Sequence, residues 1–103
     1  MAYKVIVTDD AHEDMDEAVS YIALSLANPS AASSLLAEIE ACFEQLRAFP
    51  FYYPSCGSFR FKERGYRKAS IKNYILIYRP VEEEELVYVL RFLYGGRNYD
   101  ALL

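Results

Sequence analysis

The sequence has little of what metal centres, disulfide frameworks and membrane spans require. It contains one histidine and two cysteines, Cys42 and Cys56, without the spacing of zinc ligands. We therefore expect free thiols, no metal and no cofactor. No apolar run approaches the roughly 20 residues of a transmembrane helix, and the start lacks the basic and apolar regions of a secretion signal. These absences predict a cytoplasmic protein without a membrane partner.

What the chain does contain fits one folded domain. Its 103 residues suffice for one hydrophobic core but not for two, so residues 1–103 are expected to form a single domain. Hydrophobic residues make up 53% and aromatic residues 16%, with ten tyrosines, which excludes a disordered chain.

Positive charge is concentrated in one stretch of an acidic chain. The formal net charge is −4, yet FRFKERGYRKASIK (59–72) holds six of the eleven Lys and Arg residues and a single acid. This segregation predicts a local anion-binding surface, although the acidic balance disfavours nonspecific nucleic-acid binding. The alternative is an exposed strand that charge keeps soluble.

Two amphipathic helices are predicted after a short first strand. Residues 3–8 are β-branched and apolar, which favours a strand. A helix over about 10–26 follows, with Asp9 and Asp10 as N-cap residues, and a second helix spans about 28–49, begun by Asn-Pro and ended by a proline. The join is short, so the helices form an antiparallel hairpin. Their apolar faces are expected to comprise Met15, Ala18, Val19, Ile22, Leu26, Ala32, Leu35, Leu36, Ile39, Phe43 and Leu46.

Three strands with a two-residue period follow an aromatic loop. They are predicted over about 66–72, 74–80 and 86–94, joined by a tight turn and by an acidic connection. Short connections make them antiparallel neighbours. The expected fold is α+β, in the order β-α-α-β-β-β, with a helical hairpin on one face of an antiparallel-rich sheet. Arg79 and Arg91 are expected on the open face as cross-strand neighbours.

Two segments carry a recognisable pattern, GYRKASIKNYILIYRP (65–80) and VLRFLYGGRNYDALL (89–103). The first is a basic strand leading into a Y-x-L-x-Y strand, and the second is a closing strand with a Gly-Arg element and a short apolar tail. With the strand-helix-helix opening, they resemble the RelE/ParE superfamily, the toxins of type II toxin–antitoxin systems. The resemblance covers nearly the whole chain and implies a bacterial plasmid-stabilisation toxin whose growth inhibition a cognate antitoxin neutralises.

The resemblance implies two different activities. RelE-like members are ribosome-dependent mRNA endonucleases that use 2′-OH attack without a metal, whereas ParE-like members inhibit DNA gyrase. If the chain is RelE-like, the resemblance assigns catalytic roles to Arg67, Arg97 and Tyr99. It also implies departures, because Ala69 and Ile75 are apolar where such nucleases have cations. We therefore favour a ParE-like or otherwise non-nucleolytic toxin, with a RelE-like endoribonuclease and a degenerate, nontoxic interaction protein as alternatives.

Ala69 bears on nuclease activity only if its side chain lies on the open face of the strand. Ala69 shares a face with Arg67, and we expect that face to be the open one. The same alternation points Lys68 and Lys72 to the opposite face, so neither replaces the missing cation unless the register differs.

Partner binding is the prediction that depends least on the target. A sheet with an apolar open face ringed by arginine would receive an acidic or amphipathic antitoxin segment. The expected partners are a cognate antitoxin and either DNA gyrase or the ribosome with its mRNA, and a homodimer is a further alternative. The residues expected to contact the antitoxin or the target are Arg60, Arg67, Lys68, Arg79, Arg91 and Arg97.

Overall fold

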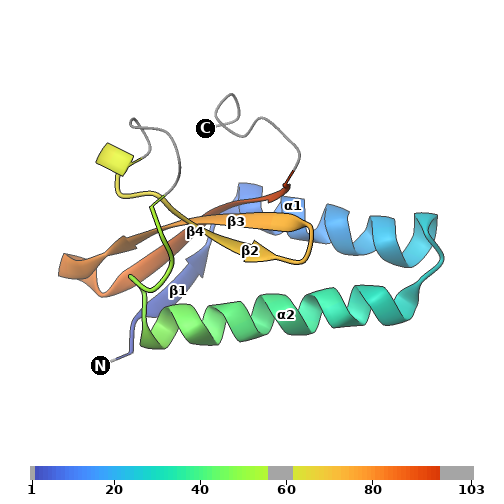
Figure 1. Cartoon of the computed structure of the whole chain (residues 1–103), viewed down its shortest axis with the longest axis horizontal. Helices are drawn as coiled ribbons and strands as arrows, with labels where there is room; N and C mark the ends of the chain where they lie inside the picture. The colour runs from blue at the N-terminus through green and yellow to red at the C-terminus, as the bar shows by residue number, and fades with distance from the viewer. Residues whose placement is uncertain (1, 56–61, 96–103) are drawn as a thin grey trace.

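The computed structural model describes residues 2–55 and 62–95, which form two antiparallel helices packed on a four-stranded sheet (Figure 1). The predicted order β-α-α-β-β-β is confirmed. In this part of the chain, no helix is both long and apolar enough to traverse a bilayer. The elements are β1 (Lys4–Val7), α1 (Asp9–Ser20), the π-helix η1 (Tyr21–Ser25), α2 (Pro29–Ala48), β2 (Arg67–Ile71), β3 (Tyr74–Val81), the 3₁₀-helix η2 (Glu82–Glu84) and β4 (Leu86–Tyr94).

The sheet is mixed, with the strand order β1-β4-β3-β2. The antiparallel pairs β2–β3 and β3–β4 follow from short connections, as predicted, whereas β1 pairs in parallel with β4. The register shifts between β3 and β4, because Ile77 is opposite Arg91 while Tyr78 is opposite Val89. Leu90 is therefore an extra residue on β4, a β-bulge that bends the strand locally.

Helix α1 is capped by Thr8 and not by an aspartate. The hydroxyl of Thr8 accepts a hydrogen bond from the Ala11 amide at 3.3 Å and donates one to the Val89 carbonyl at 2.8 Å. The prediction that Asp9 and Asp10 are the caps is wrong, and both lie in the first helical turn, where the positive helix end favours them. Thr8 is the cap because its hydroxyl ties the start of the helix to β4.

The first helix does not remain α-helical to residue 26. From Tyr21 to Ser25 it is a π-helix, and the Leu26 amide donates to the Tyr21 carbonyl at 3.1 Å. In a π-helix each amide bonds to the carbonyl five residues before it, not four. The side chains after this turn are therefore rotated away from the apolar face of the helix. Leu26 was predicted to be buried but is 56% exposed, and Leu36 of α2 is also exposed.

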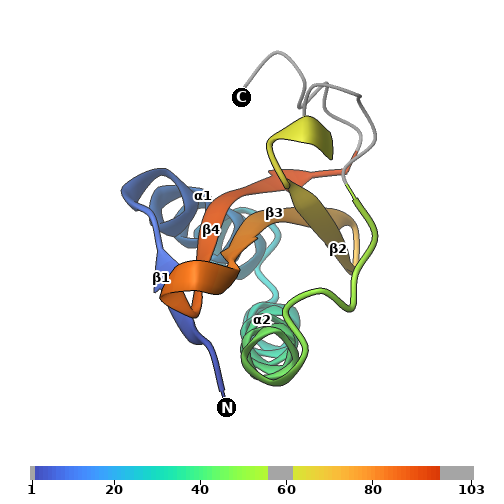
Figure 2. The ribbon, with the colours of Figure 1, turned by 90° about the vertical axis from the view of Figure 1, so that its left-hand side faces the viewer.

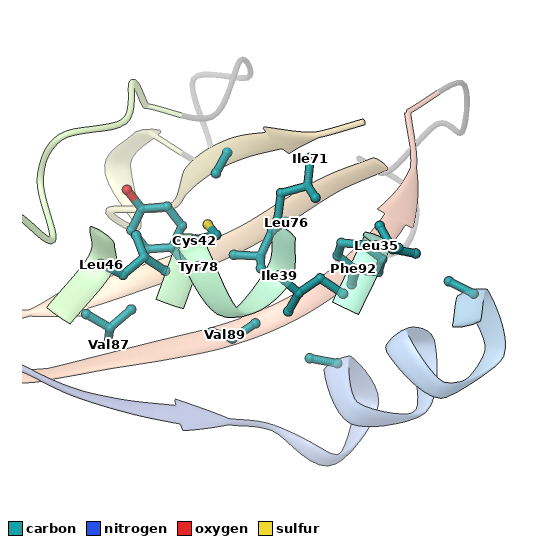
Figure 3. Close-up of a cluster of buried hydrophobic side chains, with 13 residues drawn as sticks. Leu35, Ile39, Cys42, Leu46, Ile71, Leu76, Tyr78, Val87, Val89 and Phe92 are labelled. Atoms are coloured by element: carbon teal, nitrogen blue, oxygen red, sulfur yellow. The ribbon is translucent and has the colours of Figure 1, made fainter. Parts of the chain in front are cut away.

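Helix α2 supplies the main apolar layer under the sheet. It starts as predicted, with the Asn28 side chain accepting from the Ala31 amide at 3.1 Å and Pro29 as its first residue. Cys42 is a free buried thiol, as expected, and burial raises its pKa to about 11; Cys56 lies outside the described residues. Figure 3 shows the core side chains of α2 with those of the sheet: Leu35, Ile39, Cys42, Leu46, Ile71, Leu76, Tyr78, Val87, Val89 and Phe92.

Tyr78 introduces a polar atom into this core. Its side chain is fully buried, and its hydroxyl has no hydrogen-bond partner in the described part of the chain. Burial raises its pKa well above the ordinary value for tyrosine, since the ionised form would be still harder to solvate here. A buried hydroxyl without a partner costs about 1–3 kcal/mol.

Tyr78→Phe is therefore expected to raise the free energy of unfolding by about 1 kcal/mol, because it removes the oxygen without opening a cavity. Urea denaturation followed by circular dichroism measures this change. Tyr88→Phe is the control and is expected to lower the free energy of unfolding, because the Tyr88 hydroxyl donates a hydrogen bond to Glu84 at 3.1 Å. A loss of stability in Tyr78→Phe would show that the buried hydroxyl is satisfied in solution.

Candidate partner-binding surface

The sheet has one face against α2 and one face turned away from it, which we call the open face (Figure 2). Cross-strand pairing assigns each side chain to a face, because directly opposite residues point the same way. Tyr78 and Leu76 lie on the α2 side, so the residues that alternate with them lie on the other. The open face includes Lys68, Ser70, Ile75, Ile77, Arg79, Val81, Leu86, Tyr88, Arg91 and Leu93 of β2, β3 and β4.

Arg67 does not belong to the open face. It is opposite Tyr78 in the register of β2 and β3, which places it on the α2 side. Its Nη1 donates to the carbonyl oxygens of Tyr53 at 2.6 Å and Phe51 at 3.3 Å, and its guanidinium carbon is 5.1 Å from the centroid of the Phe51 ring. The side chain that we expected on the open face thus fastens the loop after α2 to the edge strand.

The same register changes the interpretation of Ala69. Ala69 is opposite Leu76 and only 1% exposed, so core packing explains its apolar side chain. Arg67 and Ala69 do share a face, but the prediction that this face is open is wrong. Lys68 and Ser70 are the β2 residues on the open face. Ala69 therefore carries no argument for or against a nuclease.

Arg91 is engaged inside the protein. Its Nε and Nη2 donate to the two Asp14 carboxylate oxygens at 2.7 and 3.0 Å, and the Phe92 amide donates to the same carboxylate at 3.0 Å. These hydrogen bonds to Asp14 raise the pKa of Arg91. Since β1 pairs with β4 only as far as Val89, α1 contacts the β4 edge that β1 leaves open. Arg91 joins that helix to the sheet.

Arg79 is the exposed arginine of the open face. It is opposite Tyr88, and Arg91 is opposite Ile77, so the prediction that the two arginines are cross-strand neighbours is wrong. Arg79 is two residues from Ile77 on β3, so the two arginines are diagonal and not directly opposite. The Tyr88 hydroxyl donates a hydrogen bond to Glu84, and this bond raises the pKa of Tyr88. Arg79 and Tyr88 line a hollow of about 510 Å³ beside the acidic η2 connection.

The centre of the open face is apolar. Ile77 and Leu93 are buried there, and Ile75 is half-buried. Among the described residues, no cluster of His, Cys, Asp and Glu could hold a metal ion. The predicted site residues Arg60, Arg97 and Tyr99 lie outside the described residues. Because Ile77 and Leu93 are almost fully buried, the described face offers a partner the half-buried Ile75 and the exposed charge of Arg79.

Sequence reasoning missed a second surface, an open groove between the end of α1 and the ends of β3 and β4. Its volume is about 810 Å³, and its lining includes Tyr21, Tyr74 and Tyr94. Tyr21 and Tyr94 are both more than half exposed. The only signal in the sequence was the apolar run after Glu17, which a regular helical period cannot bury completely.

Comparisons with known proteins were made for sequence and for structure. The sequence matches the family described as the ParE toxin of type II toxin–antitoxin system, parDE, over residues 5–99. No curated protein matches it. The RelBE2 toxin–antitoxin complex from Mycobacterium tuberculosis has a similar chain, with 22% identity and a TM-score of 0.64, covering 91% of this chain and 99% of that one.

Two further solved structures have a similar fold. A chain of the chromosomal ParDE system from P. aeruginosa is 17% identical with a TM-score of 0.67, and the match covers 90% of this chain and 96% of that one. A free mutant of the E. coli toxin RelE is 12% identical with a TM-score of 0.68, and the match covers 99% of this chain and 93% of that one. At these identities the structures demonstrate a common fold, and they represent both branches of the superfamily.

Proposed function

The chain belongs to the ParE toxin family of type II toxin–antitoxin systems, and from this premise we propose that it inhibits growth by binding DNA gyrase and not by cutting RNA. The family match over residues 5–99 is the observation that carries the proposal. A cognate antitoxin neutralises the toxin by covering the open face. The proposed roles of toxin and antitoxin are those of a binding module and its inhibitor.

The geometry of the open face supports binding over catalysis. Cleavage by 2′-OH attack needs a general base, a general acid and cations around the phosphorus. Of the described arginines that could supply the cations, Arg67 is bonded to carbonyls on the α2 side and Arg91 to Asp14, which leaves Arg79 on the open face. On the open face, Ile77 is opposite Arg91 and fully buried, and Ile75 is half-buried. A surface of this composition favours a protein partner over a phosphodiester.

Induction of the chain without its neighbouring reading frame tests the proposal. We expect growth arrest that co-expression of the neighbouring frame reverses. Purified protein is then expected to inhibit supercoiling by DNA gyrase and to trap double-strand breaks, while transcripts in arrested cells stay intact. Normal supercoiling with excess protein would exclude gyrase as the target. Ribosome-dependent mRNA cleavage would identify a RelE-like nuclease, and unaffected growth would identify a nontoxic interaction protein.

Arg79→Ala is expected to weaken antitoxin binding about tenfold, because an exposed guanidinium can hold a carboxylate through two hydrogen bonds. Isothermal titration calorimetry with the purified antitoxin measures the dissociation constant. Lys72→Ala is the matched control, since it removes one exposed positive charge from the turn at the other end of β3. If the two variants bound the antitoxin with equal affinity, the antitoxin would not contact Arg79.

A further inference from the structure

Large apolar side chains are exposed at the end of the molecule where α1 becomes η1. Tyr21 and Leu24 of η1, the following Leu26, and Tyr94 at the end of β4 are all more than half exposed, and Leu24 reaches 80%. Tyr21, Leu26 and Tyr94 line the groove of about 810 Å³ described above. A concentration of apolar surface around one groove indicates a contact site.

The floor of this groove is aromatic. The rings of Tyr74 and Phe92 are stacked, with centroids 4.9 Å apart, and the Tyr94 ring meets Tyr74 edge-on at 5.7 Å. Aromatic faces attract Lys and Arg through the ring quadrupole while also accepting apolar contact. Phe92 is almost fully buried and Tyr74 half-buried, so the exposed Tyr94 is the ring of this floor that an apolar or cationic side chain of a partner can reach.

The wall of the groove formed by α1 is acidic. Glu17 lines the groove, and Glu13 and Asp10 continue from it along the same helix face at spacings of four and three residues. None of these three acids forms a salt bridge with a described cation, although the charges of Asp10 and Glu13 contribute to the raised pKa of Arg91. Helix α1 contains no Lys or Arg at all. Of these acids, Glu17 is the one that lines the groove, and it has no salt-bridge partner among the described residues.

We propose that this groove, which we call the acidic–aromatic groove, binds a cationic amphipathic segment of a protein partner. Apolar residues of the segment pack on Tyr21, Leu26 and Tyr94, and its Lys or Arg side chains pair with Glu17. Nucleic acids and anionic membranes carry the wrong charge for this wall. The groove is separate from the open face and from Arg79, so a partner can occupy it whether or not gyrase is the target.

Fluorescence anisotropy with a designed peptide tests the proposal on the full chain. The probe is a 16-residue helical peptide with leucine along one face and lysine along both flanks, and its matched partner has glutamate in place of every lysine. We expect the lysine peptide to bind, the glutamate peptide to bind at least tenfold more weakly, and 0.5 M salt to weaken the lysine peptide's binding. Equal binding of both peptides, or no binding of either, would overturn the proposal.

Charge reversals separate the groove from acidic protein surface in general. Glu17→Lys is expected to weaken the binding of the lysine peptide at least tenfold. Glu83→Lys is the matched control, because Glu83 is an exposed acid in η2 at the other end of β4. Equal losses in the two variants would mean nonspecific attraction and overturn the proposal. Self-association of the unmodified chain that Glu17→Lys abolishes, seen by sedimentation, would assign the groove to a second copy and also overturn it.

Discussion

Asp14→Ala is expected to lower the free energy of unfolding by about 3 kcal/mol and the melting temperature by about 10–20 °C. The substitution removes both hydrogen bonds from Arg91 and the acceptor of the Phe92 amide. Arg91 is only 19% exposed and remains charged, so its guanidinium loses its hydrogen-bonded counterion in a partly dry site and keeps only the more distant charges of Asp10 and Glu13. Thermal unfolding followed by circular dichroism measures the loss.

Two controls separate the ion pair from the general effect of losing an acid on α1. Asp16→Ala changes a carboxylate that is 80% exposed on the same helix, and its effect should stay within about 0.5 kcal/mol. Arg91→Met added to Asp14→Ala should restore part of the lost stability, because it removes the unpaired charge and keeps the apolar stem. If Asp14→Ala were no worse than Asp16→Ala, the pair would not anchor the helix.

The elements of the fold could be predicted from the sequence wherever local patterns define them. The two-residue period predicted β4 with its actual bounds, 86–94, and the Asn-Pro pair located the start of α2. Caps, turns and periodicity act over a few residues, so a single chain segment contains their signal. The π-helix at Tyr21–Ser25 has no comparable signal, because it differs from an α-helix only in the closing hydrogen bonds.

The contacts of the arginines could not be predicted in this way. Asp14 and Arg91 are 77 residues apart, and the bulge at Leu90 depends on how β4 pairs with β3. Neither the ion pair nor the bulge has a signature within one segment. The charge of Arg91 was visible in the sequence, but whether it serves the fold or a partner depends on this long-range geometry.

The face of β2 was predictable, and the prediction failed because one residue was given too much weight. Lys68, Ser70 and Lys72 alternate with Ala69 and Ile71, which is the pattern of a strand with one polar and one apolar face. That pattern puts Ala69 and Ile71 in the core, where both are at most 3% exposed. Arg67 is on the same side, but its guanidinium reaches the loop carbonyls at the margin of the core.

Ala69→Arg is expected to abolish folding. Ala69 packs against the core next to Leu76 and leaves no room for a guanidinium, and an unpaired charge buried there costs more than about 4 kcal/mol. That is a large part of the roughly 5–15 kcal/mol by which domains of this size are stable. The soluble yield and the circular dichroism spectrum of the purified variant should both show loss of the native fold.

Ser70→Arg provides the comparison that makes this result specific to the face of β2. Ser70 is exposed on the open face, opposite Ile75, so the same side chain one residue along the strand should change the free energy of unfolding by less than about 1 kcal/mol. If Ala69→Arg folded normally and Ser70→Arg did not, the register of β2 would be inverted. Arg67 and Ala69 would then face outward, and a cation at position 69 would again bear on nuclease activity.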